Sequence, residues 1–129
     1  MENKDYLTLD KLETYKLARQ LSRIGWEIYQ DLDWREKKIN GDQFVESTDS
    51  VGANIAEGFG RFHFLDKVKF YYNARASLLE SRHWFDILKE RNLVRNEALS
   101  QKYLDCYQKL RPKLNALINS VLKAKNEKS

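Results

Sequence analysis

The spacing of apolar residues most constrains the fold, because they recur every three or four positions along most of the chain. The pattern is densest from about residue 64 to residue 91, where two such rows run side by side. A repeat of 3.6 residues is typical of an amphipathic α-helix. One proline and five glycines in 129 residues leave little room for the many turns of a sheet protein. The sequence therefore predicts an all-α fold.

Four helical segments are expected, at about residues 8–30, 34–58, 64–91 and 96–123 of a single domain that spans residues 1–129. Asp33 and Glu36 have the spacing of a capping box, which starts the second segment, and Asn40-Gly41 predicts a break near residues 40–41. Short connections force consecutive helices to run antiparallel. We therefore expect an up-down-up-down four-helix bundle.

The third segment carries more apolar surface than the third of its circumference that a helix in a small bundle buries. Either the other three helices wrap around it, or it also packs against another subunit. We favour a homo-oligomer in which Phe70, Arg82 and Trp84 lie at the interface between subunits.

Arg75 and Arg82 interrupt one of the apolar rows, and a buried guanidinium group needs a carboxylate partner. If the turn at residues 58–63 makes the second and third helices a hairpin, Glu46 lies level with Arg75, and Glu57 lies too far away. We therefore predict a Glu46–Arg75 pair and no Glu57–Arg75 pair. The alternative is that either arginine reaches across a subunit boundary.

Composition and the lone cysteine narrow the class of protein. Hydrophobic residues make up 42% of the chain and charged residues 33%, which is typical of amphipathic helices rather than disorder. No apolar run approaches the ~20 residues of a membrane span, and the N-terminus lacks the layout of a signal peptide. Cys106 excludes an internal disulfide and is expected to be an inert core residue. We expect a cytoplasmic protein.

The sequence contains no nucleophile–base pair, phosphate-binding loop or zinc-ligand spacing. Glu80 and His83 have the spacing of one half of a di-iron site, but the other half is missing because Gly60 stands three residues before His63. We therefore expect a non-enzyme with no catalytic residue, no metal site and no cofactor.

The net charge of +4 lies entirely in the last segment, since residues 1–96 contain as many acidic as basic residues. A basic stripe along this helix would follow a phosphate backbone without sequence preference and would lose affinity as salt rises. The simpler alternative is a solvated helix face. The nucleic-acid candidates are Lys102, Lys109, Lys113 and Lys123, with Arg111 and Lys125 nearby.

The segment 50–61 ends the second helix. Gly58 and Gly60 predict the left-handed backbone that stops a helix and reverses the chain. Asn54 and Glu57 lie in one row with Ser50 and Arg61. This row makes either a contact for assembly or partner binding or, as we favour, a network that satisfies polar groups at the helix end.

Two motifs, SVGANIAEGFGR and YNARASLLESRHW, resemble those of bacterial four-helix-bundle proteins called 23S rRNA intervening-sequence proteins. Accessory proteins of diversity-generating retroelements look like relatives. Gly52 stands where the family often has proline, and Glu46 where it often has arginine, which argues against phosphate contact by this stretch. The matching motif residues are Ser50, Asn54, Glu57, Gly58, Arg75, Ser77 and Glu80.

The resemblance implies a ring-shaped homopentamer with no enzymatic activity assigned to it. The retroelement relatives also imply contact with nucleic acid and with a reverse transcriptase. We therefore expect a homo-oligomeric adaptor with weak, non-sequence-specific binding of RNA or single-stranded DNA. The alternative is a docking module for a polymerase or a reverse-transcriptase-like protein, without direct nucleic-acid contact.

Overall fold

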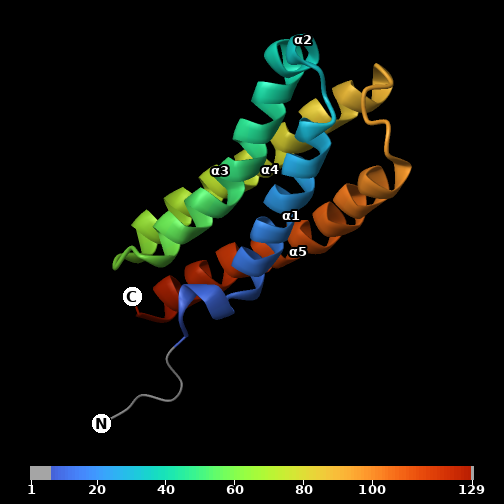
Figure 1. The fold of residues 1–129 in the computed structure, drawn as a ribbon. Coiled ribbons are helices and arrows are strands. Elements are labelled where there is room, and N and C mark those ends of the chain that lie inside the picture. The colour runs from blue at the N-terminus through green and yellow to red at the C-terminus, as the bar shows by residue number, and fades with distance from the viewer. Residues whose placement is uncertain (1–6, 129) are drawn as a thin grey trace.

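The structure is a computed structural model that describes residues 7–128 (Figure 1). The predicted all-helical class is confirmed, and the described residues contain no strand. In chain order, the elements are the 3₁₀ turn η1 (Leu9–Lys11), α1 (Glu13–Gln30), α2 (Trp34–Glu36), the π-helical turn η2 (Lys37–Gly41), α3 (Asp42–Phe59), α4 (Phe64–Glu90) and α5 (Glu97–Lys128).

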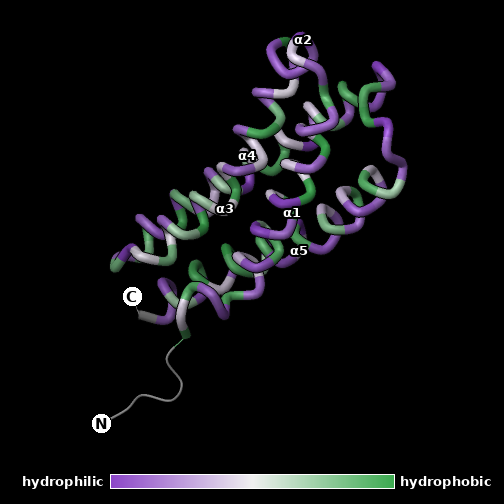
Figure 2. The backbone as a smooth tube through the Cα atoms, viewed as in Figure 1, coloured by the Kyte–Doolittle hydropathy of each residue, from purple (hydrophilic) through white to green (hydrophobic). Residues whose placement is uncertain are grey.

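The four long helices pack alongside one another (Figure 1). α3 contacts α1 and α4, and α5 also contacts α1 and α4, so each long helix has two close neighbours. Hydrophobic and hydrophilic residues alternate along all four (Figure 2). Within residues 7–128, no helix combines the length and the apolar character that crossing a membrane requires.

The second helical segment begins with the capping box that the sequence predicts. The Glu36 N–H donates to Asp33 Oδ1 at 2.8 Å, and the Asp33 N–H donates to Glu36 Oε1 at 2.9 Å. The expected break at Asn40-Gly41 is a π-helical turn instead, through which the backbone stays right-handed and helical. Arg91 Nη1 donates to the buried Asn40 Oδ1 at 2.6 Å and thereby ties this turn to the end of α4.

Aromatic rings and hydroxyl groups from α3, α4 and α5 meet in the core. The Tyr103 ring stacks on Phe85 with centroids 4.1 Å apart, and its centroid lies 5.7 Å from that of Phe44. Ser81 Oγ lies 2.6 Å from Thr48 Oγ1 and 2.7 Å from the Tyr103 hydroxyl. Each of the three helices contributes one hydroxyl to this buried row of hydrogen bonds. These hydrogen bonds therefore fix the positions of the three helices relative to one another along the bundle.

The register between α3 and α4 differs from the predicted one. Thr48 bonds to Ser81, and Gly58 packs against Tyr71. Both contacts lie further along α4 than a tight hairpin at residues 58–63 allows. The first turn of α4 therefore extends beyond the end of α3, because the connection continues along the helix axis before the chain reverses.

This register makes the predicted Glu46–Arg75 pair wrong. Interpolation between the observed contacts places Arg75 level with Asn54 rather than with Glu46. Arg75 Nη1 instead donates to Asn115 Oδ1 of α5 at 3.2 Å. Glu57 does not pair with Arg75 either, although the two lie closer than the predicted register implied.

The end of α3 also lacks the left-handed glycine that the sequence predicts. No glycine in residues 7–128 has a positive φ, and Gly60 has a φ of −78°. The last carbonyls of α3, those of Gly58 and Phe59, instead accept hydrogen bonds from Lys67 Nζ at 3.2 and 2.9 Å. This ammonium group satisfies the helix end, so no left-handed cap is needed.

α4 carries an apolar row that the chain by itself leaves uncovered. Leu65, Tyr72 and Leu79 recur every seventh residue, and they are 65%, 41% and 56% exposed. Phe70 and Trp84, which the sequence analysis places at a subunit interface, are half-buried. One subunit therefore leaves part of the apolar surface of α4 in water.

Candidate functional site

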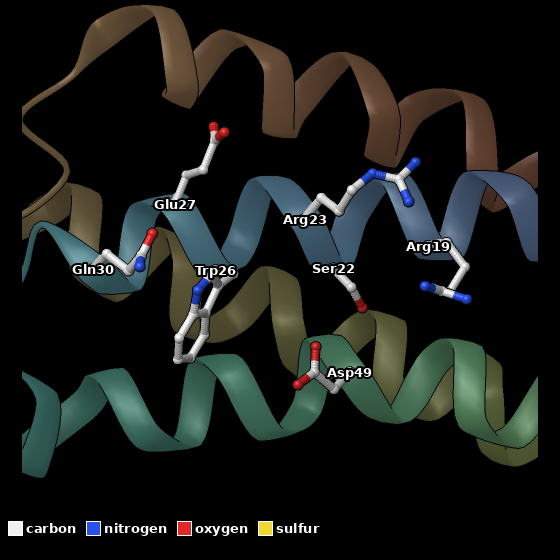
Figure 3. A pocket seen from close by; sticks show the side chains of 7 residues that line it. All are labelled: Arg19, Ser22, Arg23, Trp26, Glu27, Gln30 and Asp49. Carbon is white, nitrogen blue, oxygen red and sulfur yellow. The ribbon is translucent and has the colours of Figure 1, made fainter.

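An open groove lies between α1 and α3 (Figure 3). In Figure 3, Trp26 points from α1 toward α3, and Ser22 and Asp49 face each other across the groove. The helices approach closely here because α3 presents small residues: a methyl group at Gly52 would lie 3.6 Å from Ala18 Cβ. The lining residues are Arg19, Ser22, Arg23, Trp26, Glu27, Gln30 and Asp49.

Trp26 is an exposed aromatic ring that its neighbours hold in place. Its ring is stacked on Tyr29, with centroids 5.3 Å apart and planes 22° apart, and the residue is 50% exposed. The Tyr29 hydroxyl donates to Asp42 Oδ1 of α3 at 2.6 Å, and this hydrogen bond raises the pKa of Tyr29. Trp26 is thus anchored through Tyr29 to α3, and half of its surface stays open to a ligand.

Two arginines share the exposed face of α1 with Trp26. Arg19 Nη1 donates to the Tyr15 hydroxyl at 3.0 Å, and its guanidinium carbon lies 5.7 Å from the centroid of that ring. Neither Arg19 nor Arg23 forms a salt bridge with any residue between 7 and 128. Figure 3 shows Arg23 pointing toward α5 rather than toward α3. Both positive charges are therefore available to an anionic partner.

Arg23 of α1 lies close to the row of lysines on α5. Cys106 Sγ donates to the Leu17 carbonyl at 3.4 Å, which places the two helices in direct contact. Burial raises the pKa of the Cys106 thiol to about 11, and the nearby charges of Lys109 and Arg23 oppose this shift. Both cations therefore lie near the same thiol, on the side of the molecule where α1 meets α5.

The structure brings some of the predicted nucleic-acid residues together and separates others. Lys102, Lys109 and Lys113 share one face of α5, since they are seven and four residues apart. Arg111 lies in a different groove, beside Arg82 of α4. Lys123 is exposed and Lys125 is half-buried near the end of the helix. We define the basic surface as Lys16, Arg19, Arg23, Lys102, Lys109 and Lys113.

The α1 part of this surface is a functional candidate that was not predicted from the sequence. Lys16, Arg19, Arg23 and Trp26 follow one another at intervals of three, four and three residues, which places them on one helix face. Basic residues interleaved with an aromatic ring are a signal of nucleic-acid binding. This pattern was available in the sequence.

The motif residues of α3 make local hydrogen bonds. Asn54 Nδ2 donates to the Ser50 carbonyl at 2.9 Å, and the Ser50 hydroxyl donates to a carbonyl one turn earlier. Glu57 and Arg61 form a salt bridge of 2.7 Å. The row thus makes contacts within α3 and at its end, and whether it also serves assembly or partner binding stays a prediction.

Residues expected at a subunit interface also have partners within the chain. Arg82 Nε donates to Asp86 Oδ1 at 2.9 Å, and Trp84 Nε1 donates to Glu80 Oε2 at 3.2 Å. The motif residue Ser77 is half-buried on the same helix. Among the described residues, no three His, Cys, Asp or Glu side chains are grouped so that they would hold a metal ion.

The fold and the site define an all-helical protein of four long helices with an open basic surface. The family model of the 23S rRNA-intervening sequence protein matches residues 10–116. The chain therefore belongs to the 23S rRNA-intervening sequence protein family, which confirms the resemblance seen in its two motifs.

A solved structure supports the fold. It is described as a protein with unknown function from the S23 ribosomal protein family of Bacteroides thetaiotaomicron VPI-5482. It shares 18% sequence identity with this chain at a TM-score of 0.74, and the match covers 87% of this chain and 99% of that chain. A comparison with curated proteins gave no match.

Proposed function

We propose that the protein is a non-enzymatic, homo-oligomeric adaptor that binds single-stranded nucleic acid weakly and without sequence preference. The observation that carries the proposal is the half-exposed Trp26 ring beside Arg19 and Arg23. Any base stacks on an exposed aromatic ring, and arginine binds backbone phosphates. Glu27 and Asp49 line the same groove, and their charges keep the affinity low.

We expect Trp26→Ala to weaken the binding of a short single-stranded RNA by about tenfold, since stacking on one aromatic side chain contributes about 1–3 kcal/mol per base. Trp34→Ala is the matched control, because Trp34 is 74% exposed but does not line the groove. Fluorescence anisotropy at low salt, with an RNA of about twelve nucleotides, measures both variants. Unchanged affinity in Trp26→Ala contradicts the stacking role, and affinity that is insensitive to salt contradicts the phosphate contacts.

The proposed assembly rests on the apolar row of α4. Leu65, Tyr72 and Leu79 make an exposed row of apolar side chains next to a bundle that already has a full core, and we call this row the strip. Exposed apolar strips of this kind mark surfaces that bind other proteins. The contacts of each long helix with two neighbours support an up-down-up-down bundle. We propose that the strip contacts one neighbour in a five-membered ring and that Phe70 and Trp84, on a different face of α4, contact the other neighbour, while Arg82 stays at the edge of this contact.

Light scattering at micromolar concentration tests the assembly. The unaltered protein is expected to be larger than a monomer, and Leu79→Glu is expected to lower its mass, because a buried unpaired carboxylate opposes association. Gln43→Glu adds the same charge to an exposed position of α3, away from the proposed interface, and leaves the mass unchanged. A monomeric unaltered protein rules out the assembly.

α3 provides the observation that favours a second candidate function. It exposes Asp42, Glu46, Asp49 and Glu57, and residues 42–60 contain no lysine or arginine. Such a face repels nucleic acid and suits a basic protein surface. The second candidate is therefore a docking module for a polymerase or reverse-transcriptase-like partner without nucleic-acid contact. Absence of RNA binding at low salt favours this candidate.

A further inference from the structure

A second groove lies between α4 and α5. Arg75 lies at its edge, because its guanidinium group donates to Asn115, one of the lining residues. Two arginines of α4, seven residues apart, and one of α5 therefore lie along this groove, and we call it the arginine groove (Arg75, Arg82 and Arg111). The lining residues are Arg82, Tyr107, Gln108, Arg111, Pro112 and Asn115.

Two of the three guanidinium groups are held in position. Arg82 Nε donates to Asp86 Oδ1 at 2.9 Å, and its guanidinium carbon lies 5.1 Å from the centroid of the Tyr107 ring. The guanidinium carbon of Arg75 lies 5.0 Å from the centroid of the Tyr72 ring. The contact to Asp86 uses Nε and leaves the two terminal amino groups of Arg82 as donors. The donors are therefore oriented before a ligand arrives.

The arginine groove has more positive charge than its partners neutralise. Of its three arginines, only Arg82 forms a salt bridge within residues 7–128, with the single carboxylate of Asp86. Three guanidinium groups against one carboxylate leave an excess of two positive charges. A terminal phosphate carries a charge of about −1.5 to −2 at neutral pH, whereas a carboxylate or an internal phosphodiester carries one negative charge. The charge balance thus favours a phosphomonoester.

Pro112 adds a hydrogen-bond acceptor beside these donors. Proline has no N–H, so the carbonyl of Gln108 lacks the donor that would follow four residues later in the helix. Both residues line the groove. An unpaired carbonyl on this groove-lining turn of α5 is an acceptor for a ligand that carries a hydroxyl group as well as the phosphate.

We propose that the arginine groove binds the terminal phosphomonoester of a nucleic-acid strand. This inference rests on the proposed nucleic-acid binding and adds an end-specific contact to it. The basic surface would bind the strand along its length, and the arginine groove would bind its phosphorylated end.

The test compares short RNAs of one sequence that carry a 5′-phosphate, a 3′-phosphate or hydroxyl groups at both ends. We expect one of the phosphorylated RNAs to bind about tenfold more tightly than the hydroxyl RNA, because charge-assisted bidentate contacts to phosphate are strong. Arg111→Gln should remove this difference between the phosphorylated and the hydroxyl RNA. Arg111 is exposed, so the variant should fold. Lys102→Gln, on the basic surface, should weaken all three RNAs equally.

Equal affinities of the three RNAs for the unaltered protein overturn the proposal, and so does a difference that persists in Arg111→Gln. If no RNA binds, thermal unfolding with a nucleoside monophosphate and with the nucleoside separates the two proposals. If the monophosphate but not the nucleoside raises the unfolding temperature, and Arg111→Gln loses this rise, the arginine groove is supported although the strand-binding function fails. If neither compound raises the unfolding temperature, both proposals are overturned. An equal shift with inorganic phosphate overturns recognition of the nucleotide end.

Discussion

Gly58→Ala is expected to lower the free energy of unfolding by about 2–3 kcal/mol, the upper part of the range of about 1–3 kcal/mol for adding a methyl group to a full core. A Cβ atom at Gly58 would lie 2.7 Å from Tyr71 Cε1 and 2.8 Å from Tyr71 Cδ1, distances that ordinary packing does not tolerate. It would also lie 3.2 Å from the Lys67 carbonyl oxygen, which belongs to the backbone of α4. Tyr71 is 2% exposed, so its ring has no free space to move into. α3 and α4 must separate to admit the methyl group.

Gly60→Ala is the matched control two residues away. A Cβ atom there would meet nothing closer than two backbone oxygens at 3.7 Å, and the φ of −78° suits any residue. We expect a change of about 0.5 kcal/mol or less, with a stabilising sign if the unfolded chain loses entropy. Urea denaturation of both variants measures the contrast. Equal losses would show that flexibility at the turn, rather than contact with Tyr71, explains Gly58.

These two glycines illustrate what the sequence predicts well and what it does not. The helical class and the Asp33–Glu36 capping box follow from spacing within one segment, and both appear in the structure. The role of Gly58 depends on which residue of α4 lies against it. That residue is set by the register between helices, and the sequence contains no direct record of how far the connection runs before it turns.

The same limit applies to the two grooves. The lysines of α5 were recognisable because they repeat along one helix, and Arg19, Arg23 and Trp26 repeat in the same manner along α1. That α1 and α5 are neighbours is a property of the packed bundle, as is the meeting of Arg75 with Asn115, forty residues away. Helical periodicity identifies the exposed face of each helix but not the helix that faces it.

Stability at alkaline pH provides the second large effect. Burial raises the pKa of Tyr71 to about 12, and burial also raises the pKa of Tyr103, while an unfolded tyrosine titrates near pH 10. Below pH 10 both states keep these protons, so the two hydroxyls cause no pH dependence. Above pH 10 the unfolded chain releases protons that the folded chain retains. Stability therefore falls from about pH 10 to about pH 12, by about 1.4 kcal/mol per pH unit for each residue.

Tyr103→Phe isolates one of the two contributions. The variant keeps the hydrogen bond between Thr48 and Ser81 and removes only the hydroxyl that bonds to Ser81. We expect this to lower the free energy of unfolding by about 1 kcal/mol at neutral pH. Urea denaturation from about pH 9 to about pH 12 should then show the same slope in both proteins below pH 10 and, above pH 10, a slope that is shallower in the variant by about 1.4 kcal/mol per pH unit. Because the exposed lysines titrate alike in both proteins, their contribution cancels in the comparison. Equal slopes in the two proteins would mean that the Tyr103 hydroxyl is exposed to water in the folded state. That result would contradict a core in which the hydroxyls of Thr48, Ser81 and Tyr103 are buried and hydrogen-bonded to one another.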